Sequence, residues 1–264
     1  MMPQTLTLWP NSPSDDPRSH PTLTPVLRDD QDRPLLLVLP GGGYGGHAEH
    51  EAEVVARAFH RFGLHGAVLR YRLAPNHTHP DMLHDAQRAA RLVRAQARDW
   101  HVAGGKLAVL GFSAGGHLAS SLAVHYDRFP CAQDDLAGQF SARPDAAVLC
   151  YPVIDMAGSA THTGSRRNLL GPEPPAELME QMSTQKQVDA QTPPTFLWHT
   201  ADDPGVPVDN SLQFFAACRR HKVPAELHVF ETGAHGLGLG HGRGRPDVGV
   251  WVDLAGEFLK RHLG

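Results

Sequence analysis

The stretch GFSAGG, residues 111–116, decides how this chain is interpreted. It follows the apolar run KLAVL (106–110) and precedes the alanine-rich run HLASSLAV (117–124), so a buried strand is expected to turn sharply into a helix. The pattern G-x-S-x-G is typical of such a turn with a nucleophilic serine at its tip, because glycine on either side avoids collisions with neighbouring backbone. A structural glycine-rich turn is the alternative. Since a strand and a helix flank the pattern, it favours Ser113 as a nucleophile.

Apolar strand-like segments alternate with amphipathic helix-like segments along most of the chain. Besides the strand and helix around Ser113, strands are expected at 34–40, 65–73, 145–152, 194–200 and 225–231, and helices at 50–63, 80–100, 208–222 and 247–263. This alternation predicts an α/β fold with a mostly parallel central sheet flanked by helices. Right-handed crossovers then place the carboxyl ends of the strands along one edge, where such folds hold their ligands.

Two segments depart from the alternation. Residues 10–34 are rich in Pro, Asp, Ser and Thr and predict turns and exposed strands near a sheet edge. Residues 156–192 are rich in Gly, Pro and Ser, and only 175–182 looks helical. Because no repeat or linker divides the chain, we expect a single domain over residues 1–264, with 156–192 as a small cap inserted over the ligand-binding edge.

Composition excludes several classes of protein. The formal charge of −4 comes without a long run of one sign, which gives no reason to expect a nucleic acid or a membrane surface as partner. Cys131, Cys150 and Cys218 form no C-x-x-C pair and predict buried free thiols. The chain shows no secretory leader and no membrane-spanning run, so we expect a cytoplasmic protein. A homo-oligomer is compatible with the sequence.

The acid that a serine nucleophile needs is expected after the strand at 194–200. A serine hydroxyl requires a histidine to accept its proton and a carboxylate to orient that histidine. The loop offers Asp202 and Asp203, followed by a proline-glycine turn. We expect Asp203 to be the acid, because Asp202 is suited to bond loop amides, while Asp209 is expected to begin the next helix.

The histidine is expected after the last strand. His235 stands between Gly233 and Gly236 on the loop that follows residues 225–231, whereas His228 lies within that strand and His241 lies deeper in the glycine-rich loop. The histidines of HAEH (47–50) have no acid or cysteine partner at a spacing typical of a metal site, so no metal is expected.

The run LPGGGYGG, residues 39–46, is the candidate for stabilising an oxyanion. Adjacent glycines after a buried strand let backbone N–H groups approach a substrate closely. The expected donors are the amides of Gly42, Gly43 and Ala114, the last being the residue after the serine. A plain flexible loop is the alternative interpretation.

Together these motifs resemble the α/β-hydrolase esterases. The matching pieces are PGGGY (40–44), RYRLAP (70–75), HPDMLHDAQRA (79–89), GFSAGGHLAS (111–120), HTADDPGVPVDNS (199–211) and GAHGLGL (233–239). The resemblance is closest to the small acetyl esterases and acetylxylan-esterase-like proteins, which are related to the hormone-sensitive-lipase-like enzymes. Those lipase-like enzymes usually have a histidine before the glycine run, where this chain has Pro40, and this favours the acetyl-esterase branch.

The resemblance implies a cofactor-independent serine esterase in which Ser113, His235 and Asp203 form a catalytic triad. The substrate would be a small ester with a short acyl group, because residues 156–192 lack the large apolar surface of a lipase lid. The polar residues His162, Arg166, Arg167 and Asn168 could contact a hydroxylated alcohol such as a sugar, or be solvated.

Two other functions remain open at this point. An arylformamidase or a peptidase of the same fold would use the same three residues, although a peptidase usually carries a further large domain. A non-catalytic ligand-binding protein on a hydrolase scaffold would be free to lose one of the three, and all three are present here.

Overall fold

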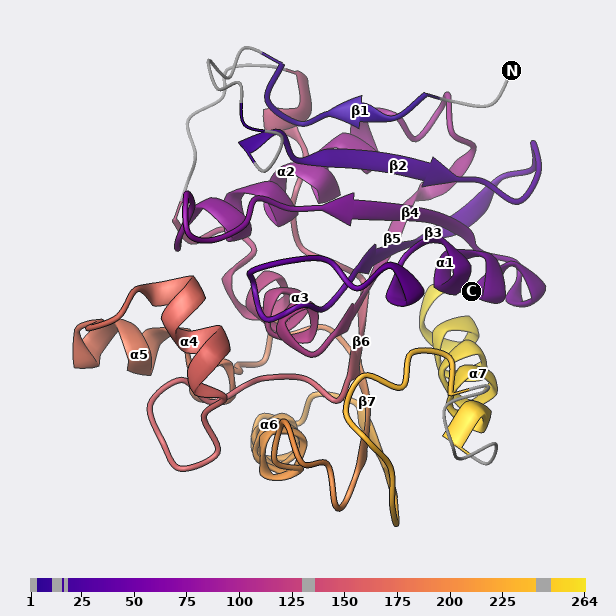
Figure 1. Ribbon diagram of the computed structural model, residues 1–264. Helices are drawn as coiled ribbons and strands as arrows, with labels where there is room; N and C mark the ends of the chain where they lie inside the picture. The colour runs from indigo at the N-terminus through magenta and orange to yellow at the C-terminus, as the bar shows by residue number, and fades with distance from the viewer. Residues whose placement is uncertain (1–3, 11–15, 17–18, 130–135, 241–247) are drawn as a thin grey trace.

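The computed structural model describes residues 4–10, 16, 19–129, 136–240 and 248–264. Its centre is an eight-stranded sheet with the order β1-β2-β4-β3-β5-β6-β7-β8 (Figure 1). The strands are β1 (Leu6–Thr7), β2 (Thr22–Val26), β3 (Arg33–Leu39), β4 (His65–Arg70), β5 (Val102–Phe112), β6 (Ala146–Cys150), β7 (Thr195–Thr200) and β8 (Ala225–Phe230). In this order, every neighbouring pair in the series β4-β3-β5-β6-β7-β8 is parallel. At the other end of the sheet, β2 pairs antiparallel with both β1 and β4.

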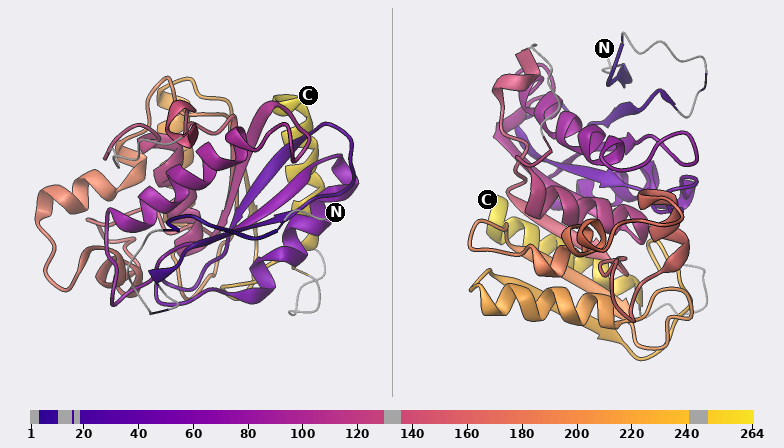
Figure 2. Two further views of the ribbon diagram at one scale, coloured as in Figure 1. Left: turned by 90° about the horizontal axis from the view of Figure 1, so that it is seen from above. Right: turned by 90° about the vertical axis from the view of Figure 1, so that its left-hand side faces the viewer.

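Helices cover both faces of this sheet (Figure 2). The α-helices are α1 (Glu53–Ala58), α2 (Asp81–Ala95), α3 (Ala114–His125), α4 (Thr163–Leu170), α5 (Ala176–Met182), α6 (Asp209–Arg220) and α7 (Trp251–Leu263). The short 3-10 turns are η2 (Glu49–Glu51), η3 (Phe59–Phe62), η4 (Leu136–Gln139), η5 (Thr184–Lys186) and η6 (Val248–Val250). The predicted α/β-hydrolase fold, a mostly parallel sheet between helices, is confirmed.

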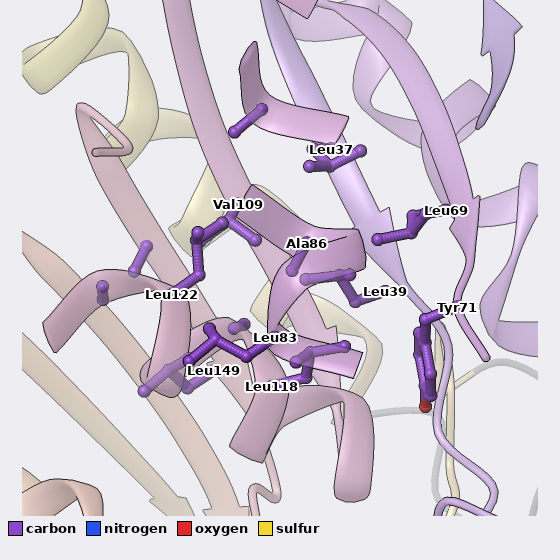
Figure 3. Close-up of a cluster of buried hydrophobic side chains, with 14 of the residues drawn as sticks. Leu37, Leu39, Leu69, Tyr71, Leu83, Ala86, Val109, Leu118, Leu122 and Leu149 are labelled. Atoms are coloured by element: carbon purple, nitrogen blue, oxygen red, sulfur yellow. The ribbon is translucent and has the colours of Figure 1, made fainter. Parts of the chain in front are cut away.

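Strand β3 shows why the sheet is buried on both sides. Leu35, Leu37 and Leu39 belong to a core shared with α2, α3 and α6, and Leu36 and Val38 to a second core shared with α1 and α7. Alternate side chains of a strand point to opposite faces, so an uninterrupted apolar run is what a strand between two helical layers requires. Figure 3 shows the first core, where leucines of β3 and β4 face Leu83 and Ala86 of α2 and Leu118 of α3.

The two segments that break the alternation are more ordered than the sequence indicates. In the first, Leu23 of β2 is fully buried, although exposed strands were expected. In the second, the structure contains α4 as well as the expected helix at 175–182, which is α5. Helix α4 was missed because its sequence TGSRRNLL has a weak hydrophobic period and poor helix formers at its start. Both helices lie on the side of the molecule toward which β4 points (Figure 1).

Cys150 and Cys218 are buried free thiols, as predicted; Cys131 and His241 lie outside the described residues. Among the helices of the described ranges, none has the length and apolar character needed to cross a membrane.

Two histidines near α4 and α5, the fully buried His117 and the half-buried His79, are held in the neutral form. His117 accepts a hydrogen bond from the Tyr44 hydroxyl at Nδ1 (2.7 Å) and donates from Nε2 to the Met182 carbonyl (2.8 Å). Burial lowers the pKa of His117 to about 4, and burial together with the nearby His125 and His84 does the same to His79. Since the ordinary value is 6.5, the unfolded chain takes up protons between pH 6.5 and 4 that the folded protein does not bind.

We therefore expect the free energy of unfolding to fall as the pH drops from 6.5 to 4, with His117 accounting for about 3 kcal/mol of the loss. Urea unfolding followed by circular dichroism at several pH values measures this slope. The variant His117→Gln, in which position 117 no longer titrates, should show a shallower slope than the parent chain. Equal slopes in the two proteins would contradict the assignment.

Candidate active site

Ser113 lies at the turn between β5 and α3 in a backbone conformation that few residues adopt. Its φ of 52° and ψ of −117° are unusual for a residue with a side chain. The surrounding backbone holds it there, because its amide donates to the Cys150 carbonyl and its carbonyl accepts from the amides of His117 and Val153. The serine is only 8% exposed, and its hydroxyl lies at the carboxyl edge of the parallel strands.

The glycines around Ser113 are required by contacts between backbone segments. A Cβ on Gly111 would stand 2.1 Å from the Gly115 carbonyl oxygen, and a Cβ on Gly115 would stand 2.2 Å from the Leu39 carbonyl oxygen. Real Cβ atoms do not approach backbone this closely, so neither position accepts another residue without rearrangement. The turn is therefore built for close packing against the end of β3.

His235 joins the serine to a carboxylate. Its Nε2 lies 2.7 Å from the Ser113 Oγ, and its Nδ1 lies 2.7 Å from the Oδ2 of Asp203. Because the carboxylate can only accept, Nδ1 carries the proton and Nε2 is the acceptor for the serine hydroxyl. The structure thus brings the three predicted residues into one hydrogen-bonded series, although 122 positions separate His235 from Ser113.

Backbone amides and a second histidine fix the carboxylate of Asp203. Its Oδ1 accepts from the amides of Gly205 (2.8 Å) and Val206 (3.0 Å), and His199 Nε2 lies 3.5 Å from Oδ2. Burial would raise the pKa of Asp203, but the contacts with His199 and His235 and the Val206 amide outweigh it and hold the pKa well below its usual range. The carboxyl group is therefore ionised.

Asp202, the alternative acid, makes a different contact. Its Oδ1 accepts from the Gly233 amide at 2.7 Å, which ties the loop after β7 to the loop that carries His235. Asp209 begins α6, as expected. The structure therefore places Asp203, and not its neighbour, against His235.

The glycine turn after β3 lies against the serine turn. A Cβ on Gly41 would be 3.2 Å from the Ser113 Cβ. Gly42 and Gly43 have φ values of 128° and 63°, which favour glycine. Within the described residues, the amides of Gly42, Gly43 and Ala114 donate to no other group, so they are free to bind an oxygen of a substrate.

Sequence reasoning missed the groups that hold this turn. The Glu51 carboxylate accepts from the Gly41 amide (2.8 Å), the Tyr71 hydroxyl donates to the Pro40 carbonyl (2.7 Å), and the Asn168 side chain donates to the Gly43 carbonyl (2.8 Å). The sequence suggested Asn168 only as a contact for a sugar or as a solvated residue. Glu51 lies in the polar run HAEHE, where nothing in the pattern distinguishes a buried carboxylate from exposed ones.

The histidines of the HAEH run have structural contacts. His47 packs against the Tyr71 ring at a centroid distance of 4.7 Å, and His50 Nε2 lies 3.0 Å from the Gly236 carbonyl oxygen. In the parts of the chain that the structure describes, no three His, Cys, Asp or Glu residues are grouped so that they could hold a metal ion.

A family model described as BD-FAE matches residues 24–217, about three quarters of the sequence. The chain belongs to the BD-FAE family. Together with the relatives described next, this match confirms the resemblance to the acetyl-esterase branch of the α/β-hydrolase esterases.

Individual relatives of the chain support the same family assignment. The crystal structure of an acetyl ester-xyloside bifunctional hydrolase from Caldicellulosiruptor lactoaceticus is 42% identical, with a TM-score of 0.91 over 99% of this chain and 97% of that one. An endo-1,4-beta-xylanase B from Butyrivibrio fibrisolvens is 42% identical over 79% of this chain and 33% of its own length. An acetylxylan esterase from Xylanibacter ruminicola is 31% identical over 82% of this chain and 45% of its own length. The chain thus spans a third to less than half of these two curated relatives.

The contrast between the two neighbouring aspartates gives a direct test of the site. We expect Asp203→Asn to lower kcat for ester hydrolysis by about 10⁴-fold, because an amide would favour the tautomer of His235 that cannot accept the serine proton. Asp202→Asn should retain kcat within about threefold, since an amide oxygen can still accept from Gly233. Steady-state kinetics on p-nitrophenyl acetate measures both variants. The reverse order of effects would identify Asp202 as the acid.

Proposed function

We propose that this BD-FAE family chain is a serine carboxylic-ester hydrolase for short-chain esters, above all acetyl esters of carbohydrates. The observation that carries the proposal is the hydrogen-bonded series from the Ser113 hydroxyl through His235 to Asp203. The names of two relatives, an acetylxylan esterase and an acetyl ester-xyloside hydrolase, support the choice of substrate.

The proposed reaction follows from the hydrogen bonds. Ser113 Oγ attacks the ester carbonyl as His235 Nε2 accepts its proton, and Asp203 stabilises the imidazolium. The amides of Gly42, Gly43 and Ala114 bind the oxyanion, each donor being worth about 3 kcal/mol of transition-state stabilisation. The alcohol leaves with the proton from His235. Water, activated by the same histidine, then hydrolyses the acyl-enzyme, and no cofactor takes part.

An arylformamidase or peptidase reaction would use the same residues, and a non-catalytic binding protein would have no need of the series. The relatives' names favour an ester over a formamide or peptide bond. Cytoplasmic location and homo-oligomerisation remain predictions from the sequence; the buried free thiols Cys150 and Cys218 support a reducing compartment.

We further propose that residues 156–192 form a small cap whose α4 contacts the alcohol part of the ester. His162, which precedes α4, accepts from the Ser165 amide at Nδ1 (3.2 Å), so the neutral ring carries its proton on Nε2. Burial, and then the nearby His235, lower the pKa of His162, which keeps the ring neutral. Its Nε2–H is thus a donor for a hydroxyl or acetyl oxygen of a sugar.

The identity of the nucleophile and the substrate class can be tested together. We expect Ser113→Ala to abolish turnover and labelling by a fluorophosphonate while the protein stays folded, with the exposed cap residue Ser159→Ala as control. Peracetylated xylose and p-nitrophenyl acetate should be hydrolysed faster than long-chain p-nitrophenyl esters or N-formylkynurenine. Retained activity of Ser113→Ala would mean that another serine reacts, and preference for the formamide would overturn the substrate assignment.

The role of His162 is tested by His162→Asn, because asparagine can still cap α4 through its side-chain oxygen but lacks the Nε2 donor. We expect kcat/KM for an acetylated xyloside to fall about three- to tenfold, the effect of one neutral hydrogen bond. The value for phenyl acetate, whose alcohol carries no oxygen besides that of the ester, should stay unchanged. A loss of the same size on both substrates would rule out a contact with the sugar.

A further inference from the structure

Glu51 is a buried carboxylate that the proposed reaction does not use. The residue is 2% exposed, whereas Glu49 in the same 3-10 turn is exposed and pairs with Arg70. Among the described residues, its one ion-pair contact is His50 Nε2, at 3.6 Å from Oε1. Burying a carboxyl group is unfavourable unless hydrogen bonds compensate for the lost water, so donors are expected around Glu51.

Both carboxylate oxygens accept hydrogen bonds from fixed donors. The Gly41 amide donates to Oε2 at 2.8 Å, and the Tyr151 hydroxyl donates to Oε1 at 2.6 Å. The same hydroxyl accepts from the Gly238 amide at 2.8 Å. Because a backbone amide can only donate, the direction of the whole chain is set: Gly238 N–H to Tyr151 O–H to Glu51, and Gly41 N–H to Glu51.

This chain of hydrogen bonds joins the two loops on which the proposed reaction depends. Gly41 directly precedes Gly42 and Gly43, and Gly238 follows His235 by three positions. A second connection runs beside it, since His50 Nε2 lies 3.0 Å from the Gly236 carbonyl oxygen. The Tyr151 ring also contacts the His235 ring edge-on, at a centroid distance of 5.1 Å.

We propose that Glu51 is a positioning residue that holds the glycine turn and the His235 loop in place relative to Ser113. The inference rests on the proposed esterase function and deepens it. By holding the Gly41 amide turned inward, the carboxylate fixes the peptide planes of the next residues, so that the amides of Gly42 and Gly43 stay available to an oxyanion. Through Tyr151 the same carboxylate anchors the segment that carries the general base.

A carboxylate suits this position better than its amide analogue. It offers two acceptor oxygens to two donors, and it packs against the turn so closely that a Cβ on Gly41 would lie 2.7 Å from Oε2. A glutamine can place its oxygen toward only one donor. If it serves Gly41, the Tyr151 hydroxyl faces an NH2 group and its own proton loses its acceptor; if it serves Tyr151, the Gly41 amide does.

The experiment compares Glu51→Gln with Glu49→Gln, a matched control that removes a neighbouring charge outside the hydrogen-bond chain. The serine concentration is first titrated with a p-nitrophenyl phosphonate, so that kcat refers to competent sites and not to total protein. We expect kcat per titrated serine to fall about 10- to 100-fold in Glu51→Gln, with KM for p-nitrophenyl acetate within about threefold of the parent. The control should match the parent chain.

A second measurement separates positioning from folding. A boronic acid forms a tetrahedral adduct with the serine and uses the same amides, so its inhibition constant should rise with the loss of kcat. If Glu51 were only structural, Glu51→Gln would have fewer titrated sites and a lower melting temperature, but unchanged kcat per site and unchanged boronic acid affinity. That result would overturn the proposal.

Tyr151→Phe provides an independent variant should Glu51→Gln fold poorly. It removes the hydroxyl but keeps the ring against His235, and it should lower kcat per site in the same way. In the double variant with Glu51→Gln, the fold loss of kcat should be smaller than the product of the two single losses, because both substitutions break the same series of hydrogen bonds. Losses that multiply would contradict the coupling of Glu51 to Tyr151. A parent chain without esterase activity would overturn the proposed function itself, whereas an active parent with an unimpaired Glu51→Gln would overturn only the role of Glu51.

Discussion

The rest of the site depends on one close approach between backbone segments. The carbonyl oxygens of Leu39 and Pro40 lie where a side chain on Gly115 would stand, at 2.2 and 2.4 Å from its Cβ. The end of β3 and the start of α3 are therefore in direct contact. Because one segment leads into the glycine turn and the other follows Ser113, the sheet itself brings the nucleophile and the expected oxyanion donors together.

The acid and the base reach this point by a different route. They follow β7 and β8, which are adjacent parallel strands, so their loops leave the sheet side by side. The Thr200 hydroxyl donates to the Gly233 carbonyl (3.0 Å), and the Gly233 amide donates to Asp202 (2.7 Å). Asp202 thus connects the two loops while Asp203 faces His235, which explains why both aspartates occur in one loop although only one of them touches the histidine.

Much of this arrangement could be predicted because its signals are local in the sequence. The alternation of strands and helices indicated the sheet, and each of Ser113, Asp203 and His235 follows a strand in a loop marked by glycine or proline. The contact of α4 with the glycine turn through Asn168 could not be predicted, because it is formed by residues 125 positions apart. The role of Glu51 could not be predicted for the same reason, because its partner Tyr151 lies 100 positions away and only the fold brings the two together.

The distribution of hydrogen bonds shows how the polar groups of the site divide their roles. Around Ser113 the carboxylates of Glu51 and Asp203 accept from backbone amides as well as from side chains, so their orientations are fixed before any substrate arrives. The amides of Gly42, Gly43 and Ala114, in contrast, have no acceptor within the described part of the chain. An amide without an acceptor gives up no hydrogen bond when it binds an oxyanion. Its neighbours already have their partners, so binding requires no reorganisation. In the proposed reaction the unpaired amides therefore bind the oxyanion, while Glu51 holds the turn that carries two of them and Asp203 orients His235.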